Sequence, residues 1–151
     1  MTKTFVETLL FASVAVNAAL LIFFAGVYRK MMNALDEATF KNLTELLMRY
    51  SSKSLFMIIV LSIPLIGAIP YYYFYGFSNW WVTSGLALWF VTGNIAKIVK
   101  LPVYKAISTL ENDEVMQLKE MRHKMNIGNL FQATFYSVAV ILMALGLCVI
   151  R

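Results

Sequence analysis

The sequence predicts an all-α, transmembrane four-helix bundle, and two observations predict it. Of 151 residues, 60% are hydrophobic and only 14% are charged, and the mean hydropathy is +0.71. Because an ordinary globular domain carries about 25% charged residues, this composition indicates a chain surrounded mostly by lipid. Four apolar stretches also reach the roughly 20 residues that a helix needs to cross a bilayer, and they lack the alternation of membrane β-strands.

The predicted spans cover residues 5–28, 55–75, 80–99 and 127–150, and residues 1–151 form one integral membrane domain. The first span is too long for a signal peptide, and its basic flank, Arg29 and Lys30, follows it, so we expect it to be retained. A four-residue turn joins spans two and three. The arrangement predicted is therefore two helical hairpins.

Both long connections, residues 29–54 and 100–126, show helical periodicity. No Pro or Gly interrupts the chain from Thr39 to Leu55, and a capping box at Ser108 and Glu111 marks a helix start in the second connection. We therefore expect helices two and four to extend beyond the membrane into the cytoplasm. Pro64 and Pro70 should kink or loosen span two.

The basic residues predict the orientation. Only Lys3 and Arg151 lie on one side of the predicted bilayer, whereas the other 11 of the 13 lysines and arginines lie on the opposite side. The positive-inside rule then places both termini outside and both long loops in the cytoplasm. The net charge of +5 is explained by this topology and by attraction to lipid headgroups. No basic stripe with interleaved aromatics is present, so no nucleic-acid partner is expected.

Several chemistries are excluded by composition. One cysteine, Cys148, rules out an internal disulfide and any multi-thiolate metal site, and one histidine, His123, is too few for bis-His haem or zinc. We expect no metal and no cofactor.

Glu7 lies near the outer surface and is expected to be solvated. The aromatic run at residues 71–77 is typical of an interfacial belt, with a stacking surface for a quinone, polyketide or sterol-like ligand as the alternative.

Polar residues inside the spans are the candidate site, because lipid cannot satisfy them. At 1.5 Å per residue, amides from three spans reach one layer in the inner half of the bilayer. The candidates are Asn17, Asn94, Lys97, His123, Asn126, Asn129 and Gln132. One interpretation is hydrogen bonding that fixes helix packing. The other is a polar pocket for a small amphipathic or planar ligand, with Lys97 or His123 supplying charge.

Three segments carry a resemblance to a known family. They are Ala25-Gly26-Val27-Tyr28 to Ala34-Leu35, Gly93-Asn94 to Leu101-Pro102-Val103-Tyr104, and Arg122 to Asn126 with Asn129. On these segments the chain resembles the anthrone-oxygenase-like family of small four-helix membrane proteins. The resemblance implies a cofactor-independent oxygenase acting on a polyketide or phenolic substrate.

Two functions follow as hypotheses. The first is a non-enzymatic bundle that binds a lipophilic small molecule, or a partner membrane protein or second copy of the chain, through its inner polar layer. The second is an oxygenase in which the amides polarise a phenolic substrate while His123 or Lys97 removes its proton. Transport is a third and weaker hypothesis.

Overall fold

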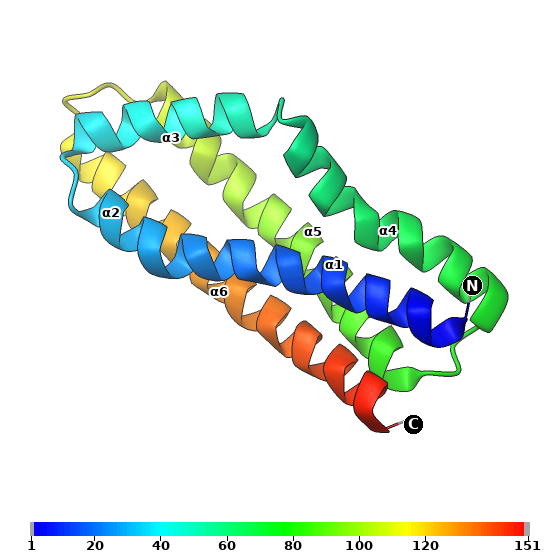
Figure 1. Cartoon of the computed structure of the whole chain (residues 1–151). Helices are drawn as coiled ribbons and strands as arrows, with labels where there is room; N and C mark the ends of the chain where they lie inside the picture. The colour runs from blue at the N-terminus through cyan, green and yellow to red at the C-terminus, as the bar shows by residue number, and fades with distance from the viewer. Residues whose placement is uncertain (1, 150–151) are drawn as a thin grey trace.

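The chain is helical almost throughout, as predicted. A computed structural model describes residues 2–149, and among these residues there are helices and no strands. The elements are α1 (Lys3–Phe23), the π-helical turn η1 (Phe24–Tyr28), α2 (Arg29–Asn33), α3 (Glu37–Ser51), α4 (Leu55–Tyr75), α5 (Trp80–Thr109) and α6 (Val115–Val149) (Figure 1). Ile150, the last residue of predicted span four, lies outside the described residues.

Four helical stretches are long and apolar enough to cross a membrane, which confirms the predicted number of spans. They run over Lys3–Asn33, Leu55–Tyr75, Trp80–Thr109 and Val115–Cys148. Three of them exceed the predicted spans. At about 1.5 Å per residue, the 30 residues of α5 reach about 45 Å and the 35 of α6 about 52 Å, against a hydrocarbon core of about 30 Å.

The predicted continuous second helix is wrong, because α3 and α4 are separate helices. α3 ends at Ser51, and α4 begins afresh after Ser54, whose hydroxyl accepts the Met57 N–H at 3.4 Å. Serine side chains compete for backbone hydrogen bonds and so favour helix ends over helix interiors. The serine-rich segment from Ser51 to Ser54 therefore breaks the helix without proline or glycine.

The predicted capping box is also wrong. Ser108 lies inside α5 and its hydroxyl donates to the Lys105 carbonyl at 2.8 Å. α5 continues past the predicted end of its span because Val103 and Ile107, one turn apart, are both buried. The start of α6 is marked instead by Glu114, whose carboxylate accepts the Glu111 N–H at 2.6 Å.

The bundle is asymmetric in its packing. α6 lies along α5, α1 packs against both α6 and α4, and α4 has little contact with α5. α1 begins and α6 ends at one end of the molecule, here called the terminal end, together with the α4–α5 turn; the α2–α3 and α5–α6 connections lie at the opposite loop end (Figure 1). α5 and α6 approach closely at Gly85, where an added Cβ would clash with Met143 Cγ and lie 2.7 Å from the Ala139 carbonyl oxygen.

Two separate groups of buried side chains hold the helices together. The first core lies toward the terminal end and contains Leu10, Val14, Ala18, Tyr71, Val82, Leu86, Trp89, Tyr136, Ala139 and Met143. The second core lies toward the loop end and contains Met32, Phe40, Val103, Ile107 and Met125. α3 contributes Phe40 to the second core, so this short helix covers the parts of α5 and α6 that extend past the predicted spans.

Candidate functional site

A cavity of about 200 Å³ whose wall contains both apolar and polar side chains lies where α1, α3, α4, α5 and α6 meet. Tyr136 in its wall belongs to the first core, and Tyr104 packs against the second, so the cavity borders both. We call it the central cavity. Its polar lining residues are Asn17, Ser51, Lys100, Tyr104, Asn129, Gln132 and Tyr136, and none of its described lining residues is acidic.

Asn17 supplies a hydrogen bond that the backbone of α4 lacks at Pro64. Pro64 has no N–H, so the carbonyl of Val60, one turn earlier, loses its partner within the helix. The Asn17 side chain donates to that carbonyl at 3.0 Å and to the Ser13 carbonyl at 2.8 Å. Asn17 is only 1% exposed, and its Oδ1 is buried without a partner among the described residues. Asn17 thus joins α1 to α4 and keeps one acceptor unused at the cavity.

Asn129 presents a whole unused amide. It is 3% exposed on α6 and makes no side-chain hydrogen bond to any residue between 2 and 149. Asparagine contributes two donors and one acceptor oxygen. Because the Asn129 side chain lines the cavity, its amide is available to a group that enters the cavity.

Lys100 brings a positive charge to the cavity. Its Nζ donates to Gln132 Oε1 at 2.9 Å, and it forms no ion pair with a carboxylate in the described part of the chain. The aliphatic stem crosses α6 at Gly128, where an added Cβ would lie 3.1 Å from Lys100 Cγ. The glycine therefore lets the lysine lie flat against α6 and reach Gln132.

A π-helical turn borders the same cavity. η1 interrupts the long first helix at Phe24–Tyr28, and Phe24 lines the cavity with its ring centroid 5.0 Å from that of Tyr28. The Tyr28 hydroxyl is buried without a partner among the described atoms. Single π-turns inside α-helices occur frequently at functional sites, which supports the central cavity as the site.

The structure brings some of the predicted site residues together. Asn17, Asn129 and Gln132 line the central cavity. Lys97 lines a second pocket of about 200 Å³ that also contains Lys100 and Gln132.

The other predicted residues lie elsewhere. Asn126 donates to Asn33 Oδ1 at 3.0 Å, which links α6 to α2. Asn94 is exposed and donates to the Phe90 carbonyl of its own helix at 2.8 Å, and His123 is exposed on α6. Neither Asn94 nor His123 lines the central cavity.

Four polar cavity residues were missed by the sequence analysis: Ser51 on α3, and Lys100, Tyr104 and Tyr136 on the two long helices α5 and α6. For the last three, i to i+4 spacing matters. Their spacing carried a usable signal. Lys100 and Tyr104 are four residues apart on α5, as are Gln132 and Tyr136 on α6, so each pair lies on one helix face. Lys100 was assigned to a loop because the apolar span was taken to end at residue 99.

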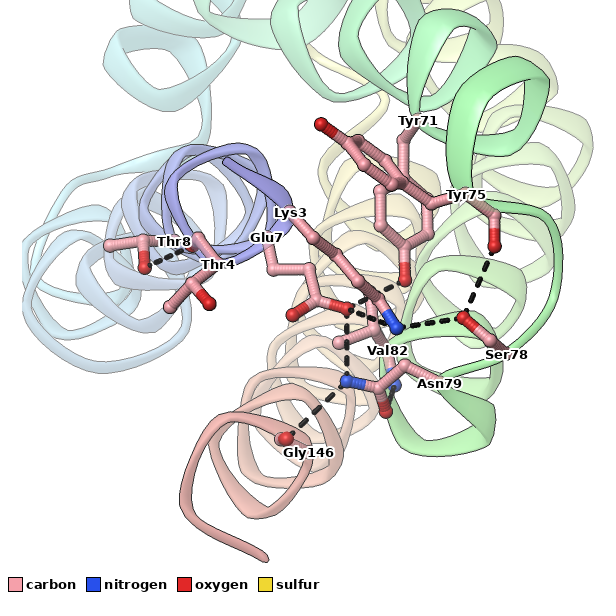
Figure 2. A network of polar contacts seen from close by, with 10 residues as sticks. All are labelled: Lys3, Thr4, Glu7, Thr8, Tyr71, Tyr75, Ser78, Asn79, Val82 and Gly146. Carbon is pink, nitrogen blue, oxygen red and sulfur yellow. Dashed lines mark hydrogen bonds and ion pairs between the residues drawn. The ribbon is translucent and has the colours of Figure 1, made fainter. Parts of the chain in front are cut away.

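A second polar cluster lies at the terminal end and is shown in Figure 2. The Glu7 carboxylate accepts from the Tyr71 hydroxyl at 2.8 Å and from the Asn79 amide at 3.1 Å. The same amide donates to the Gly146 carbonyl at 3.3 Å, while Asn79 Oδ1 accepts the Val82 N–H that begins α5. We call this set the terminal cluster; it joins α1, α4, α5 and α6.

Glu7 is therefore not solvated, contrary to the prediction. It is 6% exposed, and Tyr71 and Asn79 are fully buried. Lys3 Nζ lies 4.0 Å from the carboxylate and donates to Ser78 at 2.7 Å. The carboxylate can be buried because two donors and a nearby ammonium replace its water.

A third set of polar contacts fastens α3 to α6 at the loop end. Arg122, 8% exposed, donates to the carbonyls of Leu35 at 3.0 Å and Asp36 at 3.3 Å, and pairs with Glu37 at 3.4 Å. Its guanidinium lies 4.4 Å from the centre of the Phe40 ring. Asp36 begins α3, and hydrogen bonds from Thr39 hold the pKa of the Asp36 carboxyl below its usual value.

Within residues 2–149 no group of three or more His, Cys, Asp or Glu side chains could hold a metal ion. No family model, curated protein or solved structure matches the chain. The fold and the cavity define a class only: within residues 2–149, an all-helical chain with four helices able to span a membrane and a partly open cavity among them that contains several polar side chains.

Proposed function

We propose that this protein is a multi-pass membrane protein that binds a lipophilic small molecule by its polar head in the central cavity. The observation that supports this most directly is the unused hydrogen-bonding capacity at the cavity, where Asn17 Oδ1 is buried without a described partner and the Asn129 side chain lies in the wall without a hydrogen bond to a described residue. Polar side chains that only fix helix packing use their donors and acceptors on each other. An amphiphile with a polar head would satisfy these groups and leave its apolar part among apolar side chains.

The proposed topology places the terminal end outside and the loop end in the cytoplasm, with α1–α4 and α5–α6 as two hairpins. The charge distribution supports it, since 11 of 13 basic residues lie toward the loop end in this arrangement. α3 and the extended parts of α5 and α6 would then lie in the cytoplasm, and the central cavity in the inner half of the bilayer.

Single cysteines test this orientation. In a Cys148→Ala background, Ser78→Cys at the α4–α5 turn and Asn112→Cys at the α5–α6 turn are both exposed positions. A membrane-impermeant maleimide added to intact cells should label the cysteine at position 78 and leave the one at position 112 unlabelled. The reverse pattern would contradict the proposed topology.

Ligand binding is tested by native mass spectrometry of detergent-purified protein. Wild type should retain a small molecule, and Asn129→Leu should lose it because the cavity loses both its amide and its space. Thr134→Leu is the matched control, since Thr134 is exposed on the same helix. Wild-type protein that carries nothing, or equal retention by Asn129→Leu, would refute the proposal.

The second candidate is the oxygenase implied by the family resemblance. In that reaction one O₂ converts an anthrone to the quinone and one water. The observation that favours it is Lys100, a half-buried amine that contacts Gln132 in a cavity also lined by Asn129, which in its neutral form could take the phenolic proton. Oxygen consumption with an anthrone would then fall in Lys100→Met and persist in His123→Ala; no consumption by wild type would exclude this candidate.

A further inference from the structure

The central cavity contains an uncompensated positive charge. Four ion pairs are formed by the described residues, and they use Lys3, Lys41, Arg122 and Lys124. Lys100 has only the neutral Gln132 as a partner, and no described carboxylate lines either the central cavity or the adjoining pocket that contains Lys97. Lys100 is half-buried, and a charge withdrawn from water without a counter-ion is unfavourable, so an anion from outside the chain would be favoured at this position.

On the basis of the proposed function, we propose that the ligand is an anionic amphiphile whose carboxylate head binds Lys100. The donors around the cavity suit such a head. The Lys100 ammonium has three donors and uses one on Gln132, the Asn129 amide has two that are unused, and the Tyr104 hydroxyl makes no hydrogen bond to a described residue. A carboxylate offers two oxygens with about four acceptor sites, which this donor set can fill.

An apolar cleft beside the cavity suits the tail. It has a volume of about 320 Å³ between α4 and α5. Its lining includes Pro64, Leu65, Ala68, Leu86, Trp89 and Phe90.

The cleft and the cavity adjoin. Leu61 of the cavity is one turn from Leu65 of the cleft on α4, and the Tyr136 ring of the cavity packs against Trp89 at 6.2 Å. Because α4 has little contact with α5, a chain lying in the cleft also borders the lipid. A long-chain fatty acid combines the required head and tail.

The test compares palmitate with hexadecanol, which has the same chain length and a neutral head. Both are titrated into delipidated full-length protein in nonionic detergent and followed by native mass spectrometry. Palmitate should bind more tightly than hexadecanol. Lys100→Met should weaken palmitate binding by about 30-fold or more, the loss expected when one partner of a buried charge pair is removed. The affinity for hexadecanol should remain almost unchanged.

Two variants serve as controls. Lys105→Met removes an exposed lysine from the same helix and should leave palmitate binding unchanged. Lys100→Arg keeps the charge and should retain most of the affinity. If Lys100→Met does not fold, the ratio of palmitate to hexadecanol affinity in wild type still decides the matter.

The failures are distinguishable. Equal affinity for palmitate and hexadecanol, or equal palmitate binding by wild type and Lys100→Met, would overturn the anionic ligand and leave the proposed function intact. If neither probe binds but the purified protein retains another molecule, the ligand class is wrong and the cavity still binds. If neither probe binds and nothing copurifies, both proposals fail.

Discussion

The terminal cluster and the central cavity are both polar sites buried in an apolar bundle, but they differ in how completely they are satisfied. In the terminal cluster Glu7, Tyr71 and Asn79 bond to each other and to the backbone. In the central cavity Asn17 Oδ1 is buried without a described partner, the Asn129 side chain lines the wall without a hydrogen bond to a described residue, and Lys100 has no described counter-ion. Burial alone therefore does not separate the two sites; they differ in how many of their donors and acceptors are used within the described chain.

Because of this difference, we expect substitutions at the two sites to have opposite effects on stability and on ligand binding. A satisfied cluster loses stability when one member is removed, because the remaining partners stay buried and unpaired. An unsatisfied site loses little stability and loses its ligand.

The largest effect is expected at Glu7. Glu7→Ala leaves the Tyr71 hydroxyl and the Asn79 amide buried without their shared acceptor, which should cost about 3 kcal/mol of the free energy of unfolding. Thermal unfolding in detergent measures this as a large drop in Tm. Glu120→Ala, which removes an exposed carboxylate, is the control and should leave the Tm unchanged. A Glu7→Ala protein as stable as wild type would mean that the terminal cluster is not structural.

A somewhat smaller loss is expected at Arg122, whose two terminal guanidinium nitrogens are hydrogen-bonded or ion-paired while its Nε has no described partner. Arg122→Met removes the bonds to two carbonyls and the pair with Glu37, and should destabilise the protein by about 2 kcal/mol. Limited proteolysis should then cut first between α2 and α3, because that connection loses its attachment to α6. Cleavage spread evenly along the chain, with no preference for the α2–α3 connection, would show that Arg122 does not attach this connection to α6.

Asn17 belongs partly to each class and should respond accordingly. Asn17→Leu leaves the Val60 carbonyl unpaired in α4, at a cost of about 1 kcal/mol. Replacing Pro64 as well, in Asn17→Leu/Pro64→Ala, restores the helical N–H and should recover most of that stability. Recovery in the double variant without recovery of ligand binding would separate the two roles of Asn17; no recovery would show that the backbone repair is unimportant.

The smallest effect on stability is expected at Asn129. Asn129→Leu breaks no hydrogen bond to a described residue, so the free energy of unfolding should change by less than about 0.5 kcal/mol. Ligand retention should be lost. Parallel measurements of Tm and of copurifying ligand would show this. A loss of stability comparable to that of Glu7→Ala would remove the contrast between the two sites.

The all-helical class and the four long apolar helices were predictable because composition and span length determine them. Which side chains face the interior depends on their angular position around each helix. At about 100° per residue, Lys100 lies about 40° from the buried Ala96, whereas Asn94 lies about 200° from the buried Thr92. On α6 the buried Arg122 lies about 20° from Asn129, whereas His123 lies about 120° away. The buried face of each helix thus includes Lys100 and Arg122 and excludes Asn94 and His123.

The terminal cluster could not be predicted in the same way. Glu7 finds its donors 64 and 72 residues later in the chain. Tyr71 sits in an aromatic run whose neighbours Tyr73 and Phe74 are 82% and 71% exposed, as an interfacial belt requires. Only the packing of α4 against α1 shows that Tyr71 alone of these three turns inward.

The bond from Asn17 to the Val60 carbonyl also has a consequence for biogenesis. α4 carries a carbonyl that its own backbone cannot satisfy, and an unpaired backbone carbonyl is unfavourable in lipid. Because α1 is synthesised before α4, the Asn17 amide is already in place when this helix leaves the ribosome. A circular permutant that begins with α4 would have to insert that helix before its partner exists, and we expect it to insert poorly even though the finished fold is the same.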